Sequence, residues 1–210
     1  MKDIFEIPDW VSSAELNEIA NIVKDWERVD FRPDYGRFPG ELIATQRWHT
    51  WNNNDELGLL LKERMNQVLG ENIKVVEVDY VELCLPWDIH SESSRPLKGS
   101  STWYTFIIPL ESYESRTIIF DQTAPDYNDF YKYKELNEKC SHPIDLNFWN
   151  DNLSHCWDED REYLSLKYVG QNWKAGSTLF FKRNLFHSSD NFHVRQIGPK
   201  KFLQVLVDLE

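Results

Sequence analysis

The sequence predicts a mainly β domain with flanking helices, of the jelly-roll or antiparallel-barrel class. Two amphipathic segments near the N-terminus precede several short strand-like segments, an order typical of helices packed on one face of a β core. Nine Trp, nine Tyr and twelve Phe favour a globular, strand-containing protein over a disordered one. Potential metal ligands around His90 and at His187 lie far apart in the chain, and an antiparallel barrel can bring such segments side by side.

Two helices are expected in residues 1–72. Ser12 and Glu15 form a capping-box pattern, in which each side chain satisfies a free backbone N–H of the other residue. Apolar residues follow at helical spacing, so residues 13–26 should form an amphipathic helix. A second helix is expected over residues 55–69, because a capping Asn precedes this segment and a Gly follows it.

The β pattern begins at Ile73 and continues to Leu85. Val76, Val78 and Tyr80 alternate with polar residues, and the apolar positions then move by one residue. A slip of this kind predicts a β-bulge, or two strands that meet at a bend. Further strands are expected at Thr102–Leu110, Thr117–Phe120, Leu164–Val169, Thr178–Lys182 and Lys201–Val207.

The chain of 210 residues is long enough for one domain with a sizeable core. The barrel core should comprise residues 73–121 and 164–210. Residues 122–163 interrupt the strand pattern with aromatic and charged sequence, and segments of this length in compact domains are often lids or small subdomains. We expect a lid over the mouth of the barrel; the alternative is a structural insertion packed by its own aromatic residues.

Four potential zinc ligands lie in this insertion: Cys140, His142, His155 and Cys156. Thiolates and imidazoles bind zinc, but this spacing matches no common zinc motif, and side chains at adjacent positions rarely converge. The sequence therefore gives a zinc site little support.

Charge and targeting signals limit the expected partners. The chain has 35 acidic and 23 basic residues, a net charge of −12, and no long basic run, which argues against binding to nucleic acid. Its first residues lack the apolar run of a signal peptide, and no stretch reaches transmembrane length, so no membrane partner is expected. The odd number of cysteines does not form a disulfide framework, and a reducing cytoplasm is the simplest setting.

His90, Glu92 and His187 form the candidate metal site. Alternation along an extended segment places residues i and i+2 on the same side, so His90 and Glu92 can bind one ion. Two imidazoles and one carboxylate hold Fe(II) on one face and leave the opposite positions open for substrate and oxygen. The alternative is a surface His and Glu in a polar loop, residues 87–94.

The order of these features resembles that of the Fe(II)/2-oxoglutarate-dependent oxygenases. Helices, a strand, the H-x-E triplet, further strands, a Gly-containing strand ending in His187 and a last strand beginning with a cation follow one another as in that family. Residues 173–181 (WKAGSTLFF) and 187–192 (HSSDNF) look like the region of the second histidine in small oxygenases of the prolyl-hydroxylase and phytanoyl-CoA-hydroxylase kind, and in related proteins of marine phages.

The resemblance implies a double-stranded β-helix, or cupin-type barrel, buttressed by the N-terminal helices. It also implies that His90, Glu92 and His187 are the catalytic metal ligands, with Fe(II) and 2-oxoglutarate as cofactors and O2 as cosubstrate. The sequence departs from the family's commonest pattern, which has Asp at the middle position. Glu has the same charge and one extra methylene, so metal binding requires an adjusted backbone.

The resemblance further implies a cation at the start of the last core strand, which binds the distal carboxylate of 2-oxoglutarate. Arg is the usual choice because its planar fork binds a carboxylate in two places, and Lys serves in some members. Lys201 is the first candidate if the barrel interior is lined by the apolar odd-numbered side chains of this strand (Leu203, Val205 and Val207). Lys200 is the second candidate and requires the even-numbered face to be interior. Arg195, further upstream, is the third.

Two more residues are candidates for contact with the cosubstrate. Tyr80 stands ten residues before His90, where some relatives place a tyrosine whose hydroxyl binds 2-oxoglutarate. Thr105 lies on the strand after the H-x-E triplet and is a weaker candidate. A tyrosine of the hydrophobic core is the alternative reading of Tyr80.

The activity implied by the resemblance is hydroxylation of a small-molecule or peptide substrate, with release of succinate and CO2. A cupin-like binding protein without redox chemistry is one alternative, and a metal-dependent jelly-roll enzyme that does not use 2-oxoglutarate is another. The sequence indicates neither the substrate nor the oligomeric state.

Overall fold

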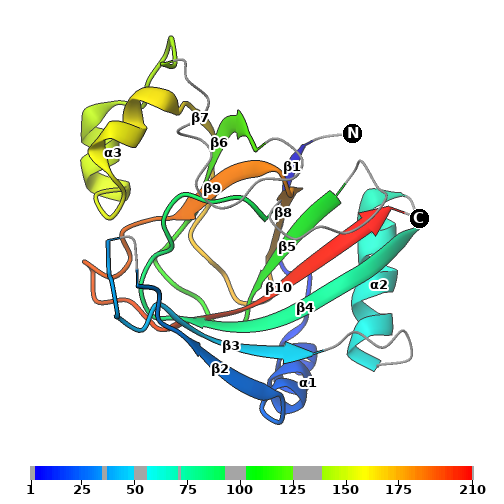
Figure 1. The fold of residues 1–210 in the computed structure, drawn as a ribbon. Helices are drawn as coiled ribbons and strands as arrows, with labels where there is room; N and C mark the ends of the chain where they lie inside the picture. The colour runs from blue at the N-terminus through cyan, green and yellow to red at the C-terminus, as the bar shows by residue number, and fades with distance from the viewer. Residues whose placement is uncertain are drawn as a thin grey trace.

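The computed structural model describes residues 3–34, 37–49, 56–70, 72–92, 103–124 and 139–209, which fold into two antiparallel sheets with helices on their outer faces (Figure 1). The larger sheet has seven strands in the order β1 (Ile4–Ile7), β8 (Thr178–Lys182), β5 (Trp103–Pro109), β10 (Lys200–Leu209), β4 (Ile73–Leu83), β3 (Ala44–His49) and β2 (Glu27–Phe31). The smaller sheet has three strands in the order β7 (Leu166–Val169), β6 (Thr117–Thr123) and β9 (Leu185–Ser189). The predicted β fold with flanking helices is confirmed.

Both predicted N-terminal helices are present. Helix α1 (Ser13–Val23) begins with the expected capping box, in which Glu15 N donates to Ser12 Oγ at 3.3 Å and Ser12 N donates to Glu15 Oε2 at 2.8 Å. It ends earlier than expected, because the chain enters β2 at Glu27. Helix α2 (Glu56–Leu69) matches its predicted extent, and Gly70 follows it with a φ of +67°.

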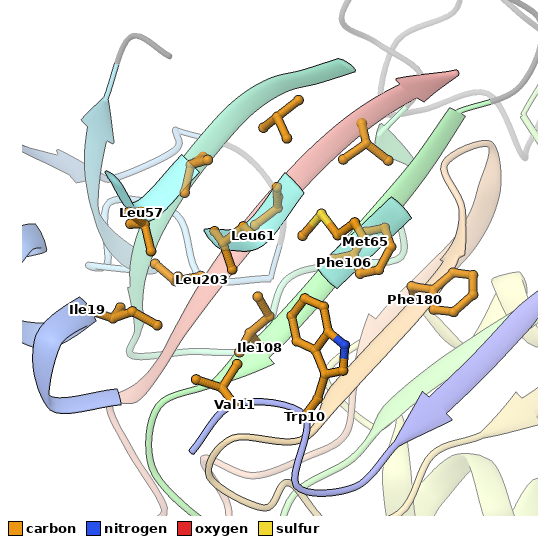
Figure 2. Close-up of a cluster of buried hydrophobic side chains, with 14 of the residues drawn as sticks. Trp10, Val11, Ile19, Leu57, Leu61, Met65, Phe106, Ile108, Phe180 and Leu203 are labelled. Atoms are coloured by element: carbon orange, nitrogen blue, oxygen red, sulfur yellow. The ribbon is translucent and has the colours of Figure 1, made fainter. Parts of the chain in front are cut away.

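The main hydrophobic core lies between these helices and the outer face of the larger sheet (Figure 2). Hydrophobic side chains of the helices and the segment before α1 pack on side chains of β5, β8 and β10. The labelled members are Trp10, Val11, Ile19, Leu57, Leu61, Met65, Phe106, Ile108, Phe180 and Leu203.

Among the described residues, no helix is long and apolar enough to span a bilayer.

Strand β4 differs from the prediction. It runs unbroken past residue 80, with Val78 and Tyr80 in the core beneath the helices and Val81 and Leu83 in a second core between the sheets. The register shift lies earlier, where Val75 and Glu77 of β4 oppose successive residues of β10. The apolar positions slip because both faces of the strand are buried, and not because the strand bends near residue 80.

Four strands were not predicted: β1, β2, β3 and β9. The first three lie at the two edges of the larger sheet, so the N-terminal part, residues 1–72, contains three strands besides the two expected helices. β1 pairs with β8, and the β2–β3 hairpin extends the sheet beyond β4. β2 (ERVDF) is largely exposed and polar, and it therefore lacks the apolar alternation that marks a half-buried strand.

The described part of the insertion, residues 139–163, packs on the outer face of the smaller sheet (Figure 1). It contains helix α3 (Leu146–Asn152) and a 3₁₀ helix, η3 (Asp158–Tyr163). Trp149, Leu153 and Cys156 are buried there against Phe120 and Phe186. This half is therefore not a lid over the barrel interior, and residues 125–138 of the expected lid lie outside the described residues.

Candidate metal centre

The fold brings the two histidines into direct contact. An isolated antiparallel bridge joins their backbones, with His90 N donating to His187 O at 3.0 Å and His187 N donating to His90 O at 2.8 Å. Their ring centroids are 4.3 Å apart. His187 is buried on the inner face of β9, with its ring 4.7 Å from that of Phe181 on the opposing sheet. Two segments far apart in the sequence thus meet between the sheets, as predicted.

The side chains of His90, Glu92 and His187 converge. One ligand atom from each residue lies within 4.8 Å of the others, the arrangement of a potential metal site. Glu92 Oε1 is 3.4 Å from His90 Nε2 and 3.7 Å from His187 Nε2. These distances fall in the range of roughly 3–4 Å expected for ligands that each lie about 2 Å from a shared ion.

The opposite ring nitrogens of both histidines are held by the backbone. His90 Nδ1 lies 2.7 Å from the carbonyl oxygen of Asp88, and His187 Nδ1 lies 3.1 Å from that of Leu185. A carbonyl oxygen only accepts, so each ring donates from Nδ1, and Nε2 is the nitrogen that faces a potential metal. The site thus presents two imidazole nitrogens of the correct tautomer.

Glu92 is positioned through both its backbone and its carboxylate. Glu92 N donates to Arg183 O at 3.1 Å, and Arg183 Nε donates to Glu92 O at 2.7 Å. Gln204 Nε2 donates to Glu92 Oε1 at 2.7 Å, the oxygen that faces both histidines. These contacts fix a side chain that is one methylene longer than Asp.

Burial and neighbouring groups set the protonation state of the site. Burial lowers the pKa of His187 to about 3, and repulsion from His90 acts in the same direction. Burial raises the pKa of Glu92, but its interactions with His90, His187 and Gln204 outweigh the effect of burial and lower the pKa to about 2. A neutral His187 beside an ionised Glu92 is the state that binds a divalent metal.

The prediction that Lys201 faces the interior is wrong. Lys201 Nζ forms an ion pair with Glu111 at 2.8 Å, and about a third of its side chain is exposed (36%). The odd-numbered side chains of β10 pack beneath the helices, whereas Phe202 packs between the sheets. The apolar face of this strand is therefore its outer face. Lys200, the second candidate, faces the interior, and Lys201, the first candidate, does not.

Lys200 is completely buried on the inner side of β10. Its Nζ donates to Ser115 Oγ at 2.9 Å and lies 4.0 Å and 4.3 Å from the ring centroids of Trp173 and Phe192. Burial lowers the pKa of Lys200 to about 7, although the carboxylate of Asp190 opposes this shift. No carboxylate among the described residues forms an ion pair with Lys200.

The remaining predicted residues divide between the two faces. Arg195 pairs with Asp190 at 2.7 Å near the surface. Tyr80 lies beneath the helices and donates to Glu82 at 2.8 Å, so it faces away from the interior. Thr105 is fully buried, paired in register with Phe181 on β8, and its hydroxyl has no hydrogen-bond partner among the described residues. Thr105 therefore remains a candidate, and Tyr80 does not.

Sequence reasoning missed two polar residues of the interior, Gln204 and Asp79. They are paired in register on β10 and β4, and Asp79 is fully buried. Burial and the nearby charge of Glu92 raise the pKa of Asp79 to about 7. A polar residue between two large hydrophobic ones in a strand was the available signal at both positions.

The four potential zinc ligands of the insertion do not form a metal site. Within the described residues, the group that converges is His90, Glu92 and His187. His155 is hydrogen-bonded to Asn191 and Ser188, and Cys140 lies beside Gln122. All three cysteines are free thiols.

No protein-family model matches the sequence, and no curated protein is detectably similar to it. Solved structures share its fold. The α-ketoglutarate-dependent epimerase SnoN from nogalamycin biosynthesis superposes with a TM-score of 0.63 and 11% identity, over 98% of this chain and 78% of SnoN. The carbocyclase SnoK of the same biosynthesis gives 0.63 and 15%, over 98% and 79%.

HygX from Streptomyces hygroscopicus, solved with nickel and 2-oxoglutarate bound, gives a TM-score of 0.56 and 11% identity, over 99% of this chain and 83% of HygX. At these identities the similarity establishes the fold. The chain has the jelly-roll fold of the non-heme, 2-oxoglutarate-dependent enzymes, as the order of its motifs led us to expect.

Proposed function

We propose that this protein is an Fe(II)/2-oxoglutarate-dependent dioxygenase that hydroxylates its substrate with release of succinate and CO2. The observation that carries the proposal is the convergence of His90, Glu92 and His187 on the inner side of this fold. The donor set fits iron, because two imidazoles and one carboxylate on one side of an ion leave positions for cosubstrate and oxygen. Iron and 2-oxoglutarate, when bound, supply the oxidation of an unactivated C–H bond.

Lys200 is the residue that would hold 2-oxoglutarate. Its ammonium group is buried and its neighbours are a hydroxyl and two aromatic rings, so an anion bound there would complete its charge pairing. Ser115 accepts from Lys200 and donates to Asp190 Oδ1 at 2.6 Å, so it orients the ammonium group. Thr105 lies opposite Leu206, six residues along β10 from Lys200, so its hydroxyl would not share the carboxylate bound at Lys200. The protein's part is to orient the cosubstrate and to exclude water from it.

The substrate in this proposal is a small molecule. SnoN has been solved with nogalamycin RO and HygX with hygromycin B, which supports a small-molecule substrate over a peptide. SnoN and SnoK are an epimerase and a carbocyclase, so the fold also serves oxidations other than hydroxylation. The acidic chain disfavours nucleic acid, and the free thiols fit a reducing cytoplasm.

An anaerobic titration tests the proposal. Fe(II) and then 2-oxoglutarate are added to the protein without oxygen, and the visible charge-transfer band of the chelate is recorded. We expect a band that requires both additions and that is absent from His187→Ala. Metal binding without the band would indicate a jelly-roll metal enzyme that does not use 2-oxoglutarate. Failure to bind metal would indicate a cupin-like binding protein and would overturn the proposal.

A further inference from the structure

His155 of the insertion makes two buried hydrogen bonds to the strand and turn that carry His187. Its Nδ1 lies 2.7 Å from Asn191 Oδ1, and its Nε2 lies 3.0 Å from Ser188 Oγ. His155, Ser188 and Asn191 are all nearly or fully buried. These contacts are part of the polar link between the insertion and the segment that begins with a metal ligand.

Ser188 connects this link to both ligand-bearing segments. It directly follows His187 on β9, and alternation places its side chain on the outer face while His187 faces inward. Its hydroxyl also lies 3.0 Å from the carbonyl oxygen of Trp87, in the segment that leads to His90. One hydroxyl therefore stands where the insertion, the strand of His187 and the approach to His90 meet.

The hydrogen-bond pattern defines the role of each group. The amide nitrogen of Asn191 donates to Asn150 O at 3.2 Å and to Ser154 Oγ at 2.9 Å, so its carbonyl oxygen faces His155. His155 therefore donates from Nδ1, and its Nε2 accepts the single hydroxyl proton of Ser188, which then contacts Trp87 O without donating to it. Burial lowers the pKa of His155 to about 4, so the ring is neutral at pH 7 and fits this pattern.

We propose that residues 139–163 act as a clamp on the metal centre, with His155 as a positioning residue that holds the two ligand-bearing segments at metal-binding spacing. The proposal rests on the metal site of the proposed function and assigns the insertion a role in metal affinity. The described half of the insertion touches the outer side of β9, opposite His187, so its action passes through the backbone of the strand. Ligand positions must be held within roughly 0.5 Å, and loss of residues that orient ligands typically costs 10- to 100-fold in metal affinity.

The test compares Co(II) affinity in variants of the whole chain, with His155→Phe as the main variant. Phe keeps a ring but removes both hydrogen bonds, whereas His155→Gln can retain the bond to Ser188. Leu153→Ala is the matched control, because Leu153 is fully buried in the same part of the insertion and has no polar side chain. Affinity is read from the visible absorption of bound Co(II), and folding from near-ultraviolet circular dichroism and Tm.

We expect His155→Phe to weaken Co(II) binding about 10- to 100-fold and to change the absorption envelope of bound Co(II). His155→Gln should recover part of this loss, and Leu153→Ala should lower Tm while keeping the affinity. If His155→Phe does not fold, Ser188→Ala removes the same bond with a smaller change and should show the same loss. Wild-type affinity in the folded His155→Phe or Ser188→Ala variant, or an equal loss in Leu153→Ala, would overturn the clamp. Failure of the wild type to bind Co(II) would instead overturn the metal site itself.

Discussion

At the scale of single residues, Lys200 makes a sharp prediction. We expect Lys200→Met to weaken 2-oxoglutarate binding roughly 10- to 100-fold, because a buried carboxylate loses a charged hydrogen bond worth about 1.5–3 kcal/mol. The measurement is the anaerobic Fe(II) titration, read at the charge-transfer band. Lys201→Met is the matched control. Lys201 pairs with Glu111 at the surface, so this variant should bind 2-oxoglutarate with wild-type affinity. A normal Lys200→Met with a defective Lys201→Met would reverse the assignment.

A second prediction concerns Gln204 and how Glu92 could bind a metal in place of the commoner aspartate. Gln204→Leu should lower Co(II) affinity about tenfold, because Glu92 Oε1 loses the amide that orients it. Glu92→Asp withdraws the carboxylate from Gln204 while its backbone stays paired with Arg183. Adding Gln204→Leu to Glu92→Asp should therefore cost little more. Additive losses in Co(II) titrations would show that the two side chains act independently.

The sequence was sufficient to predict that the candidate metal ligands converge, and insufficient for the residues around them. His90 and Glu92 follow from a spacing of two in an extended segment, and His187 from the resemblance of its region to the second-histidine region of the oxygenases. Lys201 was chosen on the assumption that the apolar face of β10 is interior. The interior of this fold is instead partly polar, and the fully hydrophobic face of β10 packs on the helices. Predicting the role of Gln204 also required knowing which face of β10 is interior, and the sequence of one strand does not show this.

At the scale of elements, β10 separates stability from cosubstrate binding. Leu203 is fully buried beneath the helices, and Leu203→Ala should lower the free energy of unfolding by about 2–5 kcal/mol without weakening 2-oxoglutarate binding. Phe202 lies on the other face with its ring 5.2 Å from Trp173, which covers Lys200. Phe202→Leu should weaken 2-oxoglutarate binding at a smaller cost in stability. Urea denaturation and the anaerobic titration measure the two quantities, and the opposite pattern would contradict the assigned faces.

Elements with a strong periodic pattern were predicted, and those whose pattern comes from tertiary context were not. The capping box and apolar spacing indicate α1, and a short apolar run indicates β8. β2 and β3 are polar strands on one side of the sheet, and β9 continues the apolar run of β8 after a turn at Arg183 and Asn184 that contains no glycine. A two-residue turn of that composition gives little local signal.

At the scale of the whole molecule, the two sheets enclose a polar interior in a strongly acidic chain. Asp79 and Glu92 lie on one side of this interior, and Lys200 is held at the start of β10 by aromatic rings. Burying the ammonium group of Lys200 therefore lowers the free energy of unfolding. A bound anion would offset this loss, and destabilising groups of this kind are typical of functional positions.

This cost makes stability depend on pH in a defined window. Burial lowers the pKa of Lys200 to about 7 in the folded protein, whereas an unfolded lysine titrates near 10.4. Between these values the unfolded chain binds more protons, so the contribution of Lys200 to stability rises with pH from about 7 to about 10. Asp190 and Arg195 also face this lysine, with opposite effects on its pKa.

The matched comparison is wild type against Lys200→Met, unfolded in urea at pH 7, 8, 9 and 10. Other groups titrate alike in both proteins and cancel in the difference. We expect wild type to gain stability relative to Lys200→Met by on the order of 1 kcal/mol per pH unit, and the gain to cease above about pH 10. Saturating 2-oxoglutarate with Co(II) should flatten the difference near neutral pH, because the bound carboxylate keeps the ammonium group charged. Parallel stability curves without the ligand would mean that Lys200 is solvated, and would remove the reason for placing the cosubstrate beside it.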